Sequence, residues 1–343
     1  MKQLLNTLFV TSEDILLGLD GENVVARRKD TVVARYPLHT LQGIISFSYI
    51  GATPALMHAC SERNVGLSFC TPRGQFLARV SGLQNGNVLL RREQYRAADD
   101  VVRSCLIARN MIIGKLYNSR WSLERTTRDY KERIETDLLK NAIEILVRQT
   151  ESASMEENLD SLRGIEGSGS SAYFAVFDQM ILRDKEHFYF RGRNRRPPLD
   201  NVNALLSLVY TILANDCASA LESVGLDSYV GFMHRDRPGR YSLALDLMEE
   251  LRPCFADRFV LTAINNRIVQ ASDFEKTESG AVLLTDDGRR KLLRAWQEKK
   301  SSSIKHPYLQ EKTSWGMIPY IQALLLARTL RGDLDGYPPF LWK

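Results

Sequence analysis

Four side chains in three separate segments of the 343-residue chain could together hold a metal ion: Glu166, His234, Asp246 and Glu249. Glu166 lies in the glycine-rich segment RGIEGSGSSA, and His234 ends the apolar segment GFMH. The other two acids lie three residues apart in SLALDLMEELRP. One imidazole with two or three carboxylates, and no cysteine, suits a hard divalent cation such as Mg²⁺ or Mn²⁺. Such an ion can promote attack on a phosphodiester bond.

The acidic residues after position 245 are predicted to share one face of a helix. Asp246 and Glu249 are at i and i+3, and Asp246 and Glu250 are at i and i+4. Like charges at this spacing repel each other unless something positive lies between them, and 243–251 contains no lysine or arginine. Both a solvated helix face and a bound cation fit this pattern. Pro253 is expected to end the helix.

Glu166 and His234 each have a structural interpretation as well. The segment from Gly167 matches the dinucleotide-binding pattern GxGxxA, but that pattern needs a preceding strand, and 154–162 looks helical. Glu166 could instead cap a helix over 172–181, and the small residues after it would leave room for a backbone phosphate. His234 could be a hydrogen-bonding group at the edge of the core, a metal ligand or an acid–base group.

Basic segments suggest contact with phosphate groups. The loop RGRNRRPP (191–198) follows the aromatic residues FYF, and guanidinium groups bind phosphates while aromatic rings stack on unpaired bases. For a second basic run, 285–305, taken by itself, a solvated helix face is the favoured explanation. The candidate DNA-binding residues are Arg191, Arg193, Arg195, Arg196, Arg235, Arg289 and Arg290.

The elements that must position these side chains predict an α+β fold. Residues 1–85 are expected to form a small β-domain with one helix at 55–63, which begins with Thr53 as N-cap and Pro54 at the first helical position. Its strands are expected at 15–19, 24–28, 31–36, 44–47, 65–70 and 75–80. Residues 86–343 are expected to form a larger all-α domain, with apolar residues at helical spacing through 101–117, 134–147 and 204–221.

Composition fits a folded globular protein, with 44% hydrophobic and 25% charged residues. The formal net charge of +5 permits a nucleic-acid partner without requiring one. The five cysteines form no CxxC pair, so a disulfide framework and a structural zinc site are not expected, and a cytoplasmic location is favoured. The N-terminus lacks the pattern of a secretory signal, and the apolar tract 204–214 is shorter than the roughly 18 residues of a membrane span.

The segments RGIEG (163–167), GFMH (231–234) and LDLMEELRP (245–253) resemble hallmark segments of the CRISPR-associated adaptation integrases, the Cas-one family. The arginine-rich loop and the tail at 322–339 look most like the subtype I-C branch. The resemblance covers essentially the whole chain. It implies an N-terminal β-domain for dimerisation and assembly and a helical catalytic domain, in agreement with the boundary near residue 85.

The resemblance also implies a site and a reaction. Mg²⁺ or Mn²⁺ would be held by Glu166, His234 and Glu249, with Asp246 as a further catalytic acid, and which of the last two acids contacts the ion is left open. The implied reaction is capture of short duplex DNA, the prespacer, and its insertion into a CRISPR array by attack of 3′-hydroxyls on repeat phosphodiesters. The implied assembly is a homodimer bridged by the small ferredoxin-like Cas-two partner, away from membranes.

Two other classes of protein fit part of the sequence. A DNA-binding scaffold with structural acidic residues would bind DNA independently of metal and yield no covalent product. A metal phosphoesterase acting on small molecules would need no basic surface, and the arginine-rich loop counts against it.

Overall fold

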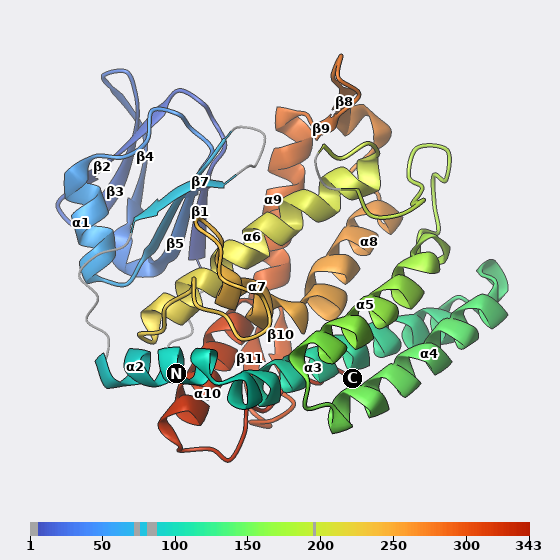
Figure 1. Cartoon of the computed structure of the whole chain (residues 1–343). Helices are drawn as coiled ribbons and strands as arrows, with labels where there is room; N and C mark the ends of the chain where they lie inside the picture. Colours follow the sequence, from blue (N-terminus) through green and yellow to red (C-terminus); the bar gives the residue numbers. More distant parts are fainter. Residues whose placement is uncertain (1–5, 72–75, 81–87, 195–196) are drawn as a thin grey trace.

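The computed structural model describes residues 6–71, 76–80, 88–194 and 197–343. An N-terminal β region is followed by a mostly helical part (Figure 1), which confirms the predicted α+β class. The predicted domain boundary near residue 85 lies in the segment 81–87, outside the described residues.

The β region contains two sheets and one helix. One sheet is antiparallel, with β2 (Ile15–Asp20), β3 (Asn23–Arg28) and β4 (Thr31–Pro37) in that order. The other has the order β1 (Asn6–Val10), β5 (Leu41–Ser46), β6 (Gly66–Cys70) and β7 (Phe76–Val80), and only its β6–β7 pair is antiparallel. Helix α1 (Pro54–Glu62) begins as predicted, since the Thr53 side chain accepts a hydrogen bond from the backbone N–H of Leu56. Strand β1 was not predicted.

The helical part contains nine α-helices within the described residues. They are α2 (Val88–Asp99), α3 (Val101–Asp129), α4 (Thr136–Met155), α5 (Leu159–Ala175), α6 (Asn201–Ser223), α7 (Ser242–Glu249), α8 (Arg258–Asn265), α9 (Asp286–Ser301) and α10 (Ile318–Arg331). Two small antiparallel sheets accompany them, one of β8 (Phe274–Lys276) with β9 (Val282–Leu284) and one of β10 (Ser303–Lys305) with β11 (Lys312–Ser314). The expectation of an all-α domain is therefore corrected to a mostly helical one.

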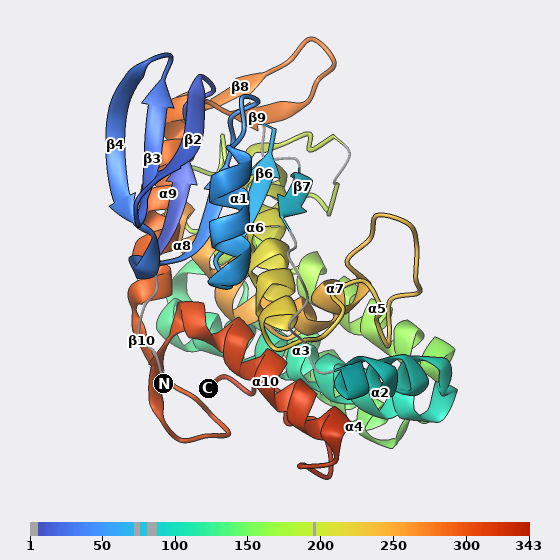
Figure 2. The same cartoon turned by 90° about the vertical axis from the view of Figure 1, so that its left-hand side faces the viewer.

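Helix α6 lies in the middle of the molecule, between the β region and helices α3 to α5 (Figures 1 and 2). By length and composition α6 could cross a membrane. This corrects the expectation that the apolar tract here, 204–214, is too short for a membrane span. However, 72% of its apolar window is buried inside the protein, and Leu205, Val209 and Leu213 are fully buried. This burial is typical of a core helix in a globular protein.

The β region and the helical part share buried contacts. Phe47 and Cys70 belong to the same apolar cluster as the helices. Arg79 on β7 donates hydrogen bonds to the Glu222 carboxylate (3.0 Å) and to the carbonyl of Asn215 (2.6 Å), which ties β7 to the second half of α6. All five cysteines are buried free thiols, in agreement with the expectation of no disulfides.

Candidate active site

Glu166 lies in the middle of α5, so the prediction that it caps a helix start is wrong. The helix begins at Asn158, whose side chain accepts hydrogen bonds from the backbone N–H groups of Asp160 and Ser161. A Cβ on Gly169 would collide with Leu116, which shows how closely α5 packs against α3 there. Glu166 is one turn before Gly169 on the same helix face, so this close packing brings its carboxylate to α3.

Asp246 is fully buried and holds the GFMH loop in place. Its Oδ2 accepts hydrogen bonds from the backbone N–H groups of Phe232 (2.6 Å) and Met233 (3.0 Å). Its Oδ1 accepts from the backbone N–H of His234 (3.0 Å) and from the Nδ1 of that ring (2.6 Å). Four donors therefore already occupy its two oxygens. Its catalytic role stays a prediction, and these contacts favour a role in positioning the loop and the imidazole of His234.

The loop reaches Asp246 only because residue 231 is glycine. A Cβ at Gly231 would lie 2.8 Å from Asp246 Oδ2 and 2.9 Å from the backbone carbon of Ser242, so any side chain would push the loop away. The hydrogen bond to Asp246 places a proton on Nδ1 of His234, which leaves the Nε2 lone pair free. Nε2 lies 4.0 Å from Glu249 Oε1, so the imidazole and this carboxylate face each other.

Lys115 of α3 lies between the two remaining carboxylates, and it was not predicted. Its ammonium contacts Glu166 Oε1 and lies 2.7 Å from Glu249 Oε2. A second cation, Arg252, has Nη2 3.1 Å from Glu249 Oε1. Residues 243–251 contain no lysine or arginine. The positive charge beside Glu249 comes instead from Arg252, just after this range, and from Lys115 on α3.

Glu249 is ionised in this setting. Burial alone would raise its pKa, but the charges of Arg252, Lys115 and His234 outweigh burial and lower the pKa to about 2. Its Oε2 is buried and accepts no hydrogen bond of good geometry, although Lys115 is near. A buried carboxylate oxygen in this state is available to a stronger cation.

These donors fit a hard divalent cation in chemical type, with carboxylate oxygens from Glu166 and Glu249 and an imidazole nitrogen from His234. As the side chains stand, however, no group of three or more His, Cys, Asp or Glu residues in the described part of the chain is spaced to hold a metal ion. The ammonium of Lys115 separates the two carboxylates. The site therefore suits such an ion only if the lysine side chain moves aside.

Glu250 faces away from this site and binds the C-terminal tail. Its carboxylate accepts hydrogen bonds from the Tyr337 hydroxyl (2.5 Å), Gln322 Nε2 (2.8 Å) and the backbone N–H of Phe340 (2.8 Å). Asn118 of α3 donates to the carbonyls of both Glu250 and Phe340 at 2.7 Å. The tail therefore supports the end of α7, directly behind Glu249.

The buried Glu250 carboxyl predicts a loss of stability as the pH rises. Burial raises its pKa from 4.5 to about 7, although the bonds from Tyr337, Phe340 and Gln322 oppose this. Between these pH values the folded state binds more protons than the unfolded state, so the free energy of unfolding falls by about 3 kcal/mol. Urea unfolding at pH 5 and pH 8 should show this fall in the wild type and a much smaller one in Glu250→Gln. The exposed Glu278→Gln is the matched control, and equal pH dependence in both variants would contradict the assignment to Glu250.

The arginine-rich loop differs from its prediction. Phe188 and Phe190 are buried in the apolar core, so they cannot stack on bases. Arg193 donates hydrogen bonds to Asn203 Oδ1 (2.6 Å) and to the carbonyl of Asn194 (2.8 Å), so its guanidinium fixes the loop to α6. Arg191 is exposed and lies over the Tyr189 ring. Arg195 and Arg196 lie outside the described residues.

Tyr210 connects this loop to the candidate active site. The guanidinium carbons of Arg193 and Arg252 lie 5.3 Å and 5.0 Å from the centre of its ring. Its hydroxyl donates a 2.6 Å hydrogen bond to Asp257. The arginine that contacts Glu249 and the arginine that fixes the loop therefore lie against the same partly buried ring.

The remaining predicted DNA contacts differ in accessibility. Arg289 is buried, pairs with Asp286 at 3.2 Å and lies over the Phe47 ring, so it is corrected to a structural residue. Arg290 is exposed and pairs with Asp287. Arg235 follows His234 directly, and its side chain is 76% exposed. Among the predicted arginines that the structure describes, it is the one adjacent in the chain to a candidate metal ligand.

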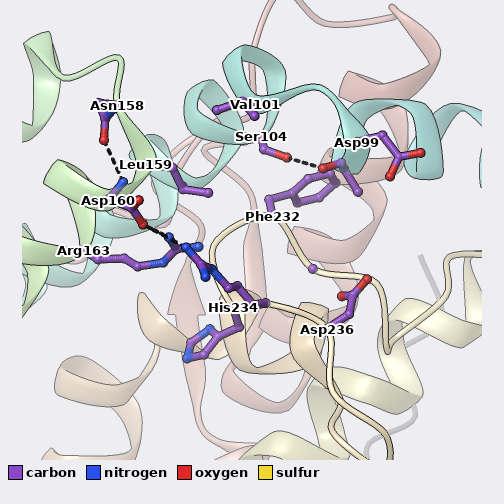
Figure 3. A pocket seen from close by; sticks show the side chains of 13 residues that line it. Asp99, Val101, Ser104, Asn158, Leu159, Asp160, Arg163, Phe232, His234 and Asp236 are labelled. Atoms are coloured by element: carbon purple, nitrogen blue, oxygen red, sulfur yellow. Dashed lines mark hydrogen bonds and ion pairs between the residues drawn. The ribbon is translucent and has the colours of Figure 1, made fainter.

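A pocket of about 340 Å³ lies beside His234. In Figure 3, Asp160 and Arg163 come from α5 on one side of His234, and Asp236 comes from the loop on the other. Arg163 donates to the carbonyl of Met233 (2.6 Å), which fixes the loop against α5. The pocket leaves one side of His234 accessible from solvent.

Comparisons of the sequence with a family model and with known proteins agree on one protein family. The family model described as CRISPR associated protein Cas1 matches residues 8–298. A CRISPR-associated endonuclease Cas1 from Chlorobaculum tepidum is 46% identical over 346 residues, and one from Rhodospirillum rubrum is 48% identical over 350 residues. Both alignments cover 100% of each chain.

Solved structures share the fold at lower identity. A casposase bound to integration product superimposes with a TM-score of 0.83 at 22% identity, covering 98% of this chain and 93% of that one. A Cas1 protein from Thermotoga maritima gives 0.80 at 20% identity, covering 95% and 97%. A chain of a Cas6-RT-Cas1–Cas2 complex gives 0.81 at 23% identity, covering 100% of this chain and 36% of that one.

Proposed function

Because the chain belongs to the Cas1 family of CRISPR-associated proteins, we propose that it is a metal-dependent DNA integrase of CRISPR adaptation. It binds short duplex DNA, the prespacer, and inserts it as a new spacer into the CRISPR array. The observation that carries this proposal is the convergence of three side chains from three elements: Glu166 and Glu249 share the buried ammonium of Lys115. His234 Nε2 lies 4.0 Å from the other oxygen of Glu249.

The chain's own residues would bind and orient the reacting groups. Glu166 and Glu249 offer carboxylate oxygens to Mg²⁺ or Mn²⁺, and His234 offers Nε2 because Asp246 holds the proton on Nδ1. The chemistry that the bound ion supplies is stabilisation of charge on the attacked phosphate and activation of the attacking hydroxyl. Arg252 keeps Glu249 ionised and oriented.

The proposed reaction is a transesterification. The 3′-oxygen of the prespacer forms a bond to a phosphorus atom of the repeat, and the bond from that phosphorus to its own 3′-oxygen breaks. The proton of the attacking hydroxyl is balanced by the proton that the leaving 3′-oxygen takes up. One phosphodiester replaces another, so the step needs no external energy source.

The partners of this function are double-stranded DNA, a second copy of the chain and a small Cas2 protein. Two attacks on opposite strands require two active sites at a fixed separation, which a homodimer bridged by Cas2 provides. The similarity to a casposase bound to integration product and to a chain of a Cas6-RT-Cas1–Cas2 complex supports DNA and Cas2 as partners. We further infer a cytoplasmic location, where the genome lies, and membership of the subtype I-C branch.

A strand-transfer assay tests the proposal. A labelled short duplex is incubated with a supercoiled plasmid carrying the repeat, with and without Mn²⁺ and Cas2. We expect covalently joined label only when the metal is present, and more of it with Cas2. Duplex binding that is independent of metal, with no covalent product, would instead identify a DNA-binding scaffold.

Arg235 is expected to contact a DNA phosphate near the active site. In Arg235→Ala, the slope of log affinity against log salt concentration should fall by about 1, since one phosphate contact is lost. Arg294→Ala is a matched control, because Arg294 is 85% exposed and also forms a single 3.3 Å ion pair, with Glu298 on α9. Filter binding between roughly 50 and 200 mM salt measures both slopes. Equal slopes would show that Arg235 contacts no phosphate.

A further inference from the structure

We propose that Lys115 is an internal counter-ion that holds the two ligand carboxylates together before metal binding and is displaced by the divalent ion. This inference rests on the proposed function, because it takes Glu166 and Glu249 as the carboxylate ligands. It adds a step to that function, since the site would then exchange one cation for another during each loading with metal.

The position of Lys115 carries the inference. It projects from α3 between Glu166 on α5 and Glu249 on α7, and its side chain is only 9% exposed. A lysine this buried needs a charged partner, and here it has two. Without it, Arg252 would still pair with Glu249 Oε1, but no cation would lie between the two carboxylates. Because Glu249 is only 5% exposed, water would screen their repulsion weakly.

The same position makes the lysine a competitor. Its ammonium contacts one oxygen of each carboxylate, Glu166 Oε1 and Glu249 Oε2. A divalent ion can bind both oxygens only if the ammonium leaves. The four-carbon stem of lysine has enough rotatable bonds to carry the ammonium to the accessible side of the site. Metal affinity therefore includes the cost of breaking the two ion pairs.

Lys115→Met removes the charge and keeps the length of the stem. We expect this variant to bind Mn²⁺ about tenfold more tightly than the wild type, because the competing ion pairs are gone. Calorimetric titration with Mn²⁺ alone, without DNA, measures the affinity. Lys140→Met is the matched control, since Lys140 forms an exposed ion pair with Asp137 on α4 and should leave the affinity unchanged.

The outcomes separate this inference from the proposed function. The proposed metal site itself is wrong if the wild type binds no Mn²⁺, or if Glu166→Gln binds Mn²⁺ as tightly as the wild type does. If the wild type binds Mn²⁺ at this site and Lys115→Met binds it equally or more weakly, the metal site stands and the displacement of Lys115 is refuted. Tighter binding in Lys115→Met alone supports the inference.

Amine labelling of the wild-type protein provides a second test that does not depend on a variant that folds. A displaced ammonium is no longer buried between carboxylates, so Mn²⁺ should increase the labelling of Lys115 several-fold, as measured by mass spectrometry. Labelling of Lys140 should not change. Unchanged labelling of Lys115 at Mn²⁺ concentrations that saturate the site would overturn the inference.

Discussion

Glu166→Gln is expected to reduce strand transfer in the presence of Mn²⁺ by roughly a thousandfold or more, because it removes a charged ligand from the proposed metal site. The amide has the shape of the carboxylate and can still accept the hydrogen bonds that Lys115 and Ser170 donate to Oε1. The fold should therefore survive. The strand-transfer assay with labelled duplex and repeat plasmid measures the loss.

Glu157→Gln is the control for this prediction, since Glu157 is exposed in the segment that precedes α5. The control should retain full activity. Both variants should bind duplex DNA as well as the wild type, because neither change touches a candidate phosphate contact. Strand transfer by Glu166→Gln at a wild-type rate would refute the assignment of Glu166, and a loss of DNA binding would show that the change acts through the fold.

Local signals explain why the β region was largely predictable. The turn at Asp20-Gly21-Glu22 separates β2 from β3, and Gly21 has a φ of 57°, a conformation that glycine adopts without strain. Thr53 and Pro54 identify the start of α1 through capping chemistry that involves only neighbouring residues. The sequence before strand β1, MKQLL, contains no glycine, proline or aspartate that would mark a turn, so local patterns did not identify the start of this strand.

The sequence motifs identified candidate site residues, but they did not indicate which side chains contact one another. Lys115 lies 51 residues before Glu166 and 134 before Glu249, so only the packing of three helices brings the three side chains together. One signal was present. Lys115 is a single charge within the apolar run MIIGKLY, and a lysine on the apolar face of a helix requires a partner.

The arginines show the opposite error. The loop at 191–198 has a composition that suits phosphate, yet Arg193 is used to fix the loop to Asn203 of α6. Arg289 follows Asp286 by three residues and pairs with it, an arrangement that the spacing alone allows but does not require. The number of charges in a segment indicates what it could bind if every side chain were exposed. Burial and internal partners decide which of these charges remain available to a phosphate group.

Asp246 and Glu249 share a helix face, so their spacing could not distinguish the ligand from the residue that orients it. The distinction comes from the loop that follows Gly231, whose three backbone N–H groups all point to Asp246. Asp246 accepts hydrogen bonds from this loop and from Nδ1 of His234. It can therefore influence a bound ion through the imidazole, which it orients. This division of roles leads to the second large effect.

Asp246→Asn is expected to lower strand transfer and Mn²⁺ affinity by up to about 100-fold each, because His234 loses the anion that fixes its tautomer and orientation. The NH₂ of the asparagine amide would also face a backbone N–H that now donates a hydrogen bond to the carboxylate. Losing this hydrogen bond should lower the free energy of unfolding by about 1–3 kcal/mol. Calorimetric titration with Mn²⁺ and urea unfolding measure the two effects separately. The exposed Asp236→Asn in the same loop is the control and should change neither. If Asp246→Asn lost stability but bound Mn²⁺ like the wild type, Asp246 would be a purely structural residue, since a positioning role requires that the affinity fall with the orientation of His234.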